Sequence, residues 1–324
     1  MGARVTGSLA ELGASIYGAA WEWRRHAYSR GFLRPRRVGA RVVSVGNLTV
    51  GGTGKTTLTL HLARRALERG LGPGVVCRRY HPGPGGRGDE ELMYRAALGD
   101  ARVFAGASKR TEAEAAARAG LDPVLVDDGF SHWALARDVD IVLLDAHDLT
   151  GGGRLLPSGR LREPLRALQR ARAVVVSRLG AGEDPAPWLE RARALAPGAL
   201  LAAARHRVTG VRARAGGELP GGTRVRVVTG TGNPAAVEAS AREAGLEVVG
   251  VSPWRDHHWF SPREAREELD RAGREDAWVL VTDKDAVRWP GDAGPARVAV
   301  LGVEWEWVVG GGAVERLVLE GEGA

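Results

Sequence analysis

A glycine-rich segment follows an apolar, β-branched stretch at residues 41–57, which read RVVSVGNLTVGGTGKTT. Glycines at 51, 52 and 54 allow successive backbone N–H groups to point at one anion, because no Cβ atom blocks its approach. Lys55 is placed to reach the β- and γ-phosphates of a nucleotide, and Thr56 to hold Mg²⁺ through its hydroxyl group. The segment therefore predicts a P-loop, a phosphate-binding turn between a strand and a helix.

The P-loop departs from the strict pattern at one position. The pattern has a glycine five residues before Gly54, where this chain has Thr49. A glycine-rich hairpin turn is the alternative, but it leaves Lys55 unexplained, whereas the helical spacing of apolar residues over 58–67 supports a nucleotide site. The residues expected to bind the nucleotide are Thr49, Gly51, Gly52, Thr53, Gly54, Lys55 and Thr56.

Length and charge limit the class of protein. A chain of 324 residues can bury a large core and is expected to form two domains. Its net charge of +7 is compatible with nucleic acid, an anionic membrane surface or a phosphorylated substrate as partner. Arginine supplies most of the positive charge, since lysine occurs only at 55, 109 and 284. Such sparing use is consistent with sites that need a compact ammonium group.

Cysteine usage and hydropathy predict a cytoplasmic protein. The single Cys77 excludes an internal disulfide and is expected to be a small buried strand residue. No run approaches the roughly 20 apolar residues of a membrane-spanning helix. Glu11 interrupts the apolar stretch near the N-terminus, so no signal peptide is expected.

The N-terminal segment is predicted to be an amphipathic helix. Over residues 8–30, apolar side chains recur at helical spacing and arginines cluster at the end. One interpretation is an interfacial helix that lies on a membrane with its cations near lipid phosphates. The other is a helix that packs on its own domain, and the pattern alone does not separate the two.

Apolar strands alternate with helical stretches through the rest of the chain. This alternation predicts an α/β protein whose first domain has a P-loop NTPase-like parallel sheet covered by helices, with ligands at the carboxyl ends of the strands. A second, smaller α/β domain is expected after a glycine-rich turn at 213–222. The expected organisation is an N-terminal helix over 1–37, a nucleotide-binding domain over 38–205 and a smaller domain over 206–324.

Acidic residues follow two of the predicted strands. Asp127 and Asp128 end the strand PVLV, where a P-loop domain places a carboxylate that holds Mg²⁺. Because adjacent side chains on a strand face opposite ways, only one is expected to bind directly unless the chain turns there. A turn aspartate that caps the next element is the alternative. Asp145 and Asp148 are a weaker candidate pair of the same kind.

Three further segments carry groups with possible chemistry. Asp89 and Glu90 follow a glycine-rich loop and could supply a base for a substrate hydroxyl, although an acidic cluster at a helix start is also ordinary capping. His257 follows Asp256 in a general-base or metal pattern, yet no third ligand has recognisable zinc spacing. The segment 282–285, Thr-Asp-Lys-Asp, is either a salt-bridged surface or a nucleotide contact.

In their order along the chain, these motifs resemble the tetraacyldisaccharide 4'-kinase family of lipid A synthesis. The resemblance covers nearly the whole sequence. It depends on SVGNLTVGGTGKT (44–56), GDE (88–90), VDDGFSHWALARDVDIVLLD (126–145), GGGRLLPSGRLREP (151–164), TGTGNP (229–234), DHHWF (256–260) and TDKDAVR (282–288).

The resemblance implies an ATP-dependent kinase that phosphorylates the 4'-hydroxyl of an acylated glucosamine disaccharide 1-phosphate lipid. It implies ATP and Mg²⁺ as cofactors, a peripheral location on the cytoplasmic face of the inner membrane, and no obligate protein partner. Carried onto this chain, the catalytic base is Asp89 and its partner is His257. We expect these two groups to come from opposite walls of a cleft and to meet only when it closes. Lys55 would act on the phosphates, with Thr56, Glu90, Asp127 and Asp128 near Mg²⁺.

Several positions depart from the family pattern. Thr57 replaces a usual proline, Ser131 a usual glutamine, and Trp133-Ala134 a pair of usual arginines, while Arg79 replaces a glycine. These departures leave the proposed base and its partner intact and put substrate contacts near 131–134 in question. The arginines of 154–162, such as Arg160 and Arg162, are candidates for the anionic head of the lipid.

Other functions fit the sequence less well. A partitioning-type ATPase would carry an early lysine in its P-loop, where this chain has Val50. A nucleic-acid binder would gather basic and aromatic side chains on one face, whereas these arginines are scattered and no reader module is recognisable. A membrane-recruited scaffold that binds nucleotide without catalysis is the remaining alternative.

Overall fold

The computed structural model describes residues 2–79, 82–83, 85–291 and 297–320, with side chains from residue 9 onward. By their packing these residues form two compact units. Unit 1 comprises Met1–Arg78, Leu98–Arg205 and Trp305–Ala324, and unit 2 comprises Arg79–Ala97 and His206–Glu304. The chain passes between the units after Arg78, after Ala97, and within the two long strands β7 (Leu200–Ala213) and β11 (Val298–Val309).

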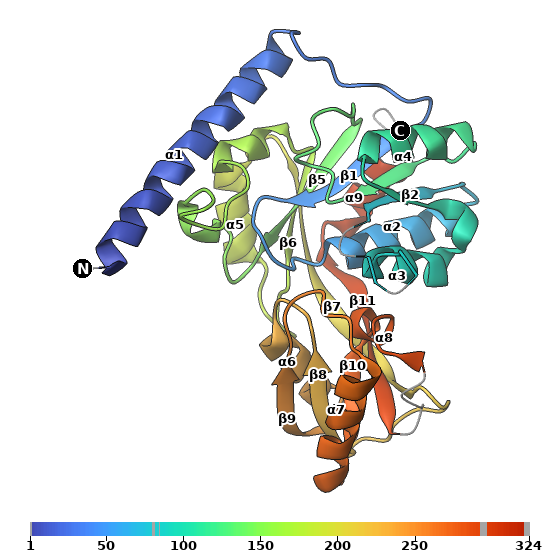
Figure 1. Cartoon of the computed structure of the whole chain (residues 1–324). Helices are drawn as coiled ribbons and strands as arrows, with labels where there is room; N and C mark the ends of the chain where they lie inside the picture. Colours follow the sequence, from blue (N-terminus) through green and yellow to red (C-terminus); the bar gives the residue numbers. More distant parts are fainter. Residues whose placement is uncertain (1, 80–81, 84, 292–296, 321–324) are drawn as a thin grey trace. The chain divides into compact units, whose positions relative to one another are not determined.

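Unit 1 is built on a parallel sheet with the strand order β3-β2-β4-β1-β5-β6-β7 (Figure 1). Apolar, β-branched runs form its central strands, and their residues are buried along their whole length, as expected for a sheet covered on both faces. Cys77 lies fully buried in β2, as predicted. The strands are β1 (Val42–Asn47), β2 (Gly74–Arg78), β3 (Val103–Gly106), β4 (Val124–Asp127), β5 (Val139–Asp145) and β6 (Ala173–Ser177).

Helices connect the parallel strands of unit 1. The glycine-rich loop leaves β1 and leads into α2 (Lys55–Glu68), whose N-cap Gly54 has a left-handed backbone (φ 88°) that glycine adopts without strain. Helices α4 (Lys109–Arg118), α5 (Ala186–Leu195) and α9 (Gly311–Leu319) complete the unit. The stretch EPLRALQRA forms a 3-10 helix (Leu165–Arg170), which ends three residues before β6 begins.

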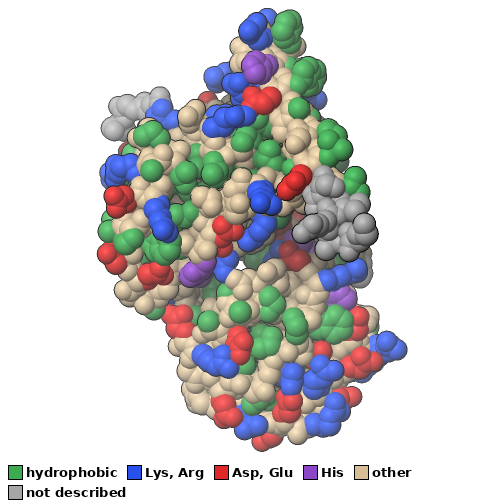
Figure 2. Space-filling view, turned by 90° about the vertical axis from the view of Figure 1, so that its left-hand side faces the viewer, with side chains coloured by type: hydrophobic (Ala, Val, Ile, Leu, Met, Phe, Trp, Pro, Cys, Tyr) green, Lys and Arg blue, Asp and Glu red, His purple; other side chains and the backbone are tan. Residues whose placement is uncertain are grey.

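Helix α1 (Gly2–Ser29) packs one face against unit 1 and leaves apolar side chains on another. Trp21 and Ala27 are buried, while Leu9, Leu12, Ile16 and Trp23 are exposed. Figure 2 views the molecule from the side of α1 and shows hydrophobic side chains beside those of lysine or arginine in the upper part of this face. No helix within the described residues is long and apolar enough to cross a membrane.

The departure at Trp133 has a structural role in holding α1. The Trp133 ring lies 6.0 Å from the Trp21 ring and 5.6 Å from that of Tyr28, both on α1. The Arg170 guanidinium lies between two rings, 4.0 Å from Trp133 and 4.3 Å from Phe130, within cation–π distance of both. This aromatic cluster secures the C-terminal half of α1 to unit 1.

Unit 2 contains a smaller parallel arrangement with the strand order β11-β10-β8-β9. Its strands are β8 (Arg224–Thr229), β9 (Glu247–Pro253), β10 (Trp278–Thr282) and part of β11. Its helices are α3 (Asp89–Leu98), α6 (Pro234–Glu243), α7 (Pro262–Arg274) and the short α8 (Asp283–Ala286). Helix α7 begins with a capping box, in which Ser261 and Glu264 each satisfy a backbone N–H of the other.

The units differ from the predicted domain boundaries at two segments. The segment 79–97 packs with unit 2 although it lies in the middle of the predicted nucleotide-binding domain. In the same way, 305–324 groups with unit 1, where Glu315 of α9 contacts His61 (2.9 Å) and Arg65 (3.1 Å) of α2. Such long-range packing is not visible in the order of motifs along the chain.

Candidate active site

The glycine-rich loop of unit 1 lies where β1 ends, between the ends of β4 and β5. Because the sheet is parallel, the carboxyl ends of these strands meet at one edge, which is the usual ligand site of such sheets. Gly51 has a φ of +116°, a conformation that disfavours any other residue. The loop is held by its neighbours, since the Ser177 hydroxyl donates to the Thr53 carbonyl (2.8 Å) and Val50 N–H to the Arg160 carbonyl (2.9 Å).

The predicted nucleotide-binding residues lie in this loop and at the first turn of α2. Lys55 and Thr56 are the first two residues of the helix, so the positive end of its dipole points toward the same place as the glycine amides. Lys55 Nζ donates to Asn47 Oδ1 (3.1 Å), which directs the ammonium group along the loop. Thr49 is different, because it is buried and forms an isolated bridge with Leu161 outside the turn.

The acidic pair after β4 reaches the start of α2 with both carboxylates. Asp127, the last residue of β4, accepts a hydrogen bond from the Thr56 hydroxyl (3.1 Å). Asp128 has a φ of +52°, so the chain turns there and its carboxylate lies 3.8 Å from Lys55 Nζ. Arg162 Nη1 donates to both Asp128 oxygens (2.8 and 2.9 Å). The turn removes the strand restriction that would have allowed only one carboxylate to face the site.

The charges around Asp128 alter its protonation. Burial alone would raise the pKa of this carboxyl, but Lys55, then Lys109 and Arg162, lower it from about 3.8 to about 2. Asp128 is therefore ionised throughout the neutral range. Its backbone carbonyl accepts a hydrogen bond from Lys109 Nζ, and Lys109 is itself buried.

Asp145 and Asp148 pair with arginines. Arg178 Nη1 donates to Asp145 Oδ2 (2.6 Å), and Arg160 Nη1 donates to Asp148 Oδ2 (3.2 Å). Both arginines also contact carbonyls of the loop, Arg178 that of Gly52 (3.4 Å) and Arg160 that of Val50 (3.1 Å). These two aspartates therefore support the loop through arginine.

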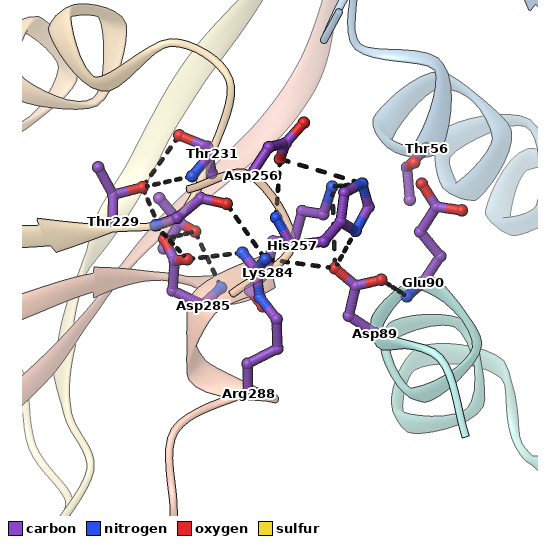
Figure 3. Close-up of polar contacts among 12 residues, drawn as sticks. Thr56, Asp89, Glu90, Thr229, Thr231, Asp256, His257, Lys284, Asp285 and Arg288 are labelled. Atoms are coloured by element: carbon purple, nitrogen blue, oxygen red, sulfur yellow. Dashed lines mark hydrogen bonds and ion pairs between the residues drawn. The ribbon is translucent and has the colours of Figure 1, made fainter. Parts of the chain in front are cut away.

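Asp89 and His257 form a hydrogen-bonded pair within unit 2 (Figure 3). Asp89 is the first residue of α3 and is buried, and its Oδ2 lies 2.8 Å from His257 Nδ1. Its Oδ1 accepts a hydrogen bond from the Glu90 backbone N–H (2.9 Å). The expectation that these groups meet only on cleft closure is wrong, because the segment carrying Asp89 packs with 206–304 and the contact is already made.

The neighbours of Asp89 favour its ionised form. Burial raises the pKa of the Asp89 carboxyl, but the hydrogen bond from His257 and the charges of Lys284 and Arg288 outweigh burial and lower the pKa below its ordinary value. Lys284 Nζ lies 3.8 Å and Arg288 Nη1 3.6 Å from Asp89 Oδ2. The carboxylate thus accepts hydrogen bonds from His257 and the Glu90 N–H, and two cations lie beside it.

A buried ion pair lies next to Asp89. Asp285 and Arg288 are fully buried and joined at 2.6 Å. Asp285 also accepts hydrogen bonds from Gly230 N–H (2.9 Å) and from the hydroxyls of Thr229 and Thr282 (2.8 and 2.7 Å). The motifs TGTGNP and TDKDAVR, separate in the sequence, therefore form one platform.

The structure also explains the conformation of His257. Its φ is +60°, which is rare for a residue with a side chain, and its N–H donates to the Gly230 carbonyl (3.1 Å). A Cβ on Gly230 would lie 3.0 Å from the Arg255 carbonyl oxygen and 3.3 Å from His258 Cβ. A larger residue at 230 would therefore require the histidine loop to move by a few tenths of an ångström.

The sequence motifs predict no role for Lys109, Arg288 or Asn47, and for Lys284 they do not separate a surface charge from a nucleotide contact. Lysine usage was the available signal, because all three lysines of this arginine-rich chain contact residues of the candidate site. Glu90 lies beside Asp89 in unit 2, whereas Thr56, Asp127 and Asp128 belong to unit 1. Among the described residues, no three His, Cys, Asp or Glu side chains cluster as a metal site.

Together the parallel sheet and the glycine-rich loop at its carboxyl edge define a nucleotide-binding α/β protein. The fold agrees with a solved structure described as the "apo" form of LpxK from Aquifex aeolicus in complex with ATP. That likeness has a TM-score of 0.69 at 23% identity and covers 97% of this chain and 98% of that one. The predicted fold class is confirmed.

Residues 8–320 match the family model described as tetraacyldisaccharide-1-P 4'-kinase. A tetraacyldisaccharide 4'-kinase from Anaeromyxobacter sp. (strain Fw109-5) is 36% identical, with 92% of this chain and 87% of the relative covered. One from Geobacter sulfurreducens is 33% identical, with 88% and 85% covered. The chain belongs to the tetraacyldisaccharide-1-P 4'-kinase family and is a kinase, which confirms the predicted resemblance.

Proposed function

We propose that the protein transfers the γ-phosphoryl group of ATP to the 4'-hydroxyl of tetraacyldisaccharide 1-phosphate, a step of lipid A synthesis. Family membership supports this reaction. The 2.8 Å hydrogen bond between Asp89 and His257 is the main support for assigning these two residues to catalysis. It orients an ionised carboxylate in a chain that also has a glycine-rich loop suited to phosphate.

The loop and the start of α2 would bind the triphosphate of ATP. Backbone amides of the glycine turn and the N-terminus of α2 attract phosphate oxygens, and Lys55 adds a positive charge. Phosphoryl transfer asks a protein mainly for positioning and for neutralisation of charge, and these groups supply both.

The donor set beside the loop fits Mg²⁺. This ion prefers hard oxygen ligands and retains several waters, so a hydroxyl and one or two carboxylates suffice on the protein side. The Thr56 hydroxyl donates to the Asp127 carboxylate, and Asp128 is next in the chain. Glu90 is proposed as a further ligand from the family resemblance alone. When bound, Mg²⁺ would neutralise developing charge on the phosphate oxygens.

Asp89 would accept the proton of the 4'-hydroxyl as that oxygen attacks the γ-phosphorus. Its low pKa keeps it ionised, and the hydrogen bond to His257 fixes its orientation. The oxygen Oδ1, which accepts only from the Glu90 N–H in the contacts described, has a remaining lone pair for the acceptor hydroxyl.

We also propose that α1 attaches the protein peripherally to a membrane surface, at the cytoplasmic face where ATP is present. Its exposed Leu9, Leu12, Ile16 and Trp23 follow helical spacing, and arginines continue from its C-terminal part into the following segment. Because the opposite face of α1 packs on unit 1, both interpretations of the helix hold together in this proposal.

Transfer of labelled γ-phosphate from ATP to tetraacyldisaccharide 1-phosphate in detergent micelles tests the proposal. We expect transfer by the wild type and a loss of at least about 100-fold in Asp89→Asn, with ATP binding retained. The control Asp270→Asn makes the same change at an exposed position of α7 and should transfer normally. Folded wild type that binds ATP without transferring phosphate would refute the reaction, and a normal rate in Asp89→Asn would refute the base.

A further inference from the structure

Lys284 contacts the ring nitrogen of His257 that Asp89 does not contact. It is the second residue of α8, and its Nζ lies 3.2 Å from His257 Nε2, while His257 Nδ1 lies 2.8 Å from Asp89 Oδ2 (Figure 3). Lys284 Nζ also lies 3.8 Å from Asp89 Oδ2. The imidazole therefore has a cation at one nitrogen and an anion at the other.

The chemistry of the two neighbours determines which nitrogen carries the hydrogen. A lysine ammonium group has three donors and no acceptor, so Nε2 must accept and be unprotonated. An ionised carboxylate only accepts, so Nδ1 must be the protonated nitrogen. The other neutral tautomer would direct an N–H at the ammonium of Lys284 and a lone pair at the carboxylate of Asp89, and both contacts would be repulsive.

The charges of Asp256 and Arg288 do not reverse this conclusion. Asp256 Oδ1 lies 3.9 Å from Nε2, too far for a hydrogen bond, and it accepts from the His257 backbone N–H at 3.1 Å. Arg288 Nη1 lies 3.6 Å from Asp89 Oδ2 and helps to keep that carboxylate ionised. The hydrogen-bonding geometry at both ring nitrogens therefore favours the neutral tautomer with hydrogen on Nδ1.

Both partners are held by the same buried platform. Arg288 Nε donates to the Lys284 carbonyl (3.1 Å), and Arg288 Nη1 donates to the Gly230 carbonyl (3.1 Å). That Gly230 carbonyl also accepts the His257 N–H. The buried guanidinium of Arg288 thus contacts the backbone of Lys284 directly and that of His257 through the shared Gly230 carbonyl.

We propose that Lys284 is a positioning residue for the kinase reaction: it holds His257 in the Nδ1–H tautomer, and His257 in turn orients Asp89. This role rests on the proposed function, in which Asp89 is the base. Lys284 acts through His257 and needs no contact with either substrate. The reaction depends on this tautomer because only Nδ1–H can donate to Asp89 Oδ2 and leave Oδ1 for the acceptor hydroxyl.

The first test is spectroscopic and does not require turnover. Long-range ¹H–¹⁵N correlation spectra of protein labelled in histidine, with His257 assigned by its loss in His257→Gln, report which ring nitrogen is protonated. We expect a protonated Nδ1 and an unprotonated Nε2 in the wild type. In Lys284→Met only Asp89 still favours Nδ1–H, so the two nitrogen shifts should move toward each other as the other tautomer becomes partly populated. A wild-type ring protonated on Nε2, or an unchanged pattern in Lys284→Met, would overturn the proposal.

The second test separates positioning from general stability. Loss of a hydrogen bond to a charged group predicts a fall in kcat of about 10- to 100-fold in Lys284→Met, with KM for ATP within about twofold of wild type. Lys284→Arg should recover part of the rate, because guanidinium also only donates. Arg263→Met removes a cation from an exposed site of α7 and should change neither rate nor spectrum.

The outcomes also distinguish this inference from the function it rests on. One combination of results is that Asp89→Asn transfers phosphate normally, the wild-type spectrum shows the Nδ1–H tautomer, and Lys284→Met depletes that tautomer. The base assignment then fails and the tautomer assignment holds. If Asp89→Asn is inactive and Lys284→Met keeps full kcat, the positioning role of Lys284 is refuted while the proposed base stands.

Discussion

The buried pair of Asp285 and Arg288 gives a sharp prediction for the stability of unit 2. Both side chains are fully buried, and Asp285 accepts four hydrogen bonds, from Arg288, Gly230, Thr229 and Thr282. In Asp285→Asn the guanidinium loses its nearest counter-charge, and breaking a buried pair in this way costs about 3–5 kcal/mol. We expect the lower end, about 3 kcal/mol, because the Asp89 carboxylate remains 3.6 Å from Arg288.

Urea unfolding followed by tryptophan fluorescence measures this loss, since Trp254, Trp278 and Trp289 report on unit 2. Asp276→Asn is the matched control. It makes the same substitution in an ion pair with Arg297 at 2.9 Å, but the side chains there are 83% and 52% exposed, so the cost should stay below about 1 kcal/mol. If Asp285→Asn is no less stable than Asp276→Asn, the pair does not support the platform as we argue.

Three further predictions concern the loop, the helix and acid stability. Lys55→Met should lower kcat by about 100-fold or more in the transfer assay, because it removes a preorganised charge on the phosphates; a near-normal rate would exclude Lys55 from the mechanism. Replacing Leu12 and Ile16, 58% and 63% exposed, with glutamate should reduce sedimentation with anionic vesicles and spare ATP binding, and unchanged sedimentation would contradict the interfacial role of α1. The folded state lowers the pKa of Asp128 to about 2. The ionised Asp128 carboxylate therefore stabilises the folded state above about pH 4, and this contribution to the free energy of unfolding is lost as pH falls toward 2. Acid unfolding should therefore show a difference between wild type and Asp128→Asn that disappears over that range, and a constant difference would refute the charge interaction.

Local sequence determined much of the secondary structure of unit 1. Buried strands such as β5 consist of continuous apolar residues, and the glycine turn before Lys55 needs only backbone conformations and a helix start to create an anion site. The position of Asp127 at a strand end follows from the same local pattern. These features require no knowledge of distant contacts, and for that reason the loop and fold class could be predicted.

Tertiary structure decided the pairing of Asp89 with His257. Asp89 and His257 are 168 positions apart in the sequence. The segment that carries Asp89 lies between two segments of unit 1 but packs in unit 2, and the pattern of apolar residues does not indicate this packing. The left-handed turn at Asp128 and the approach of Lys284 to His257 likewise depend on packing around buried charges. Sequence motifs identified the side chains that could take part in the reaction. The distances between these side chains exist only in the folded chain, and they determine the protonation of Asp89 and the tautomer of His257. The physical reason is that Coulomb interactions and hydrogen bonds act over a few ångströms of space, whatever the separation in sequence.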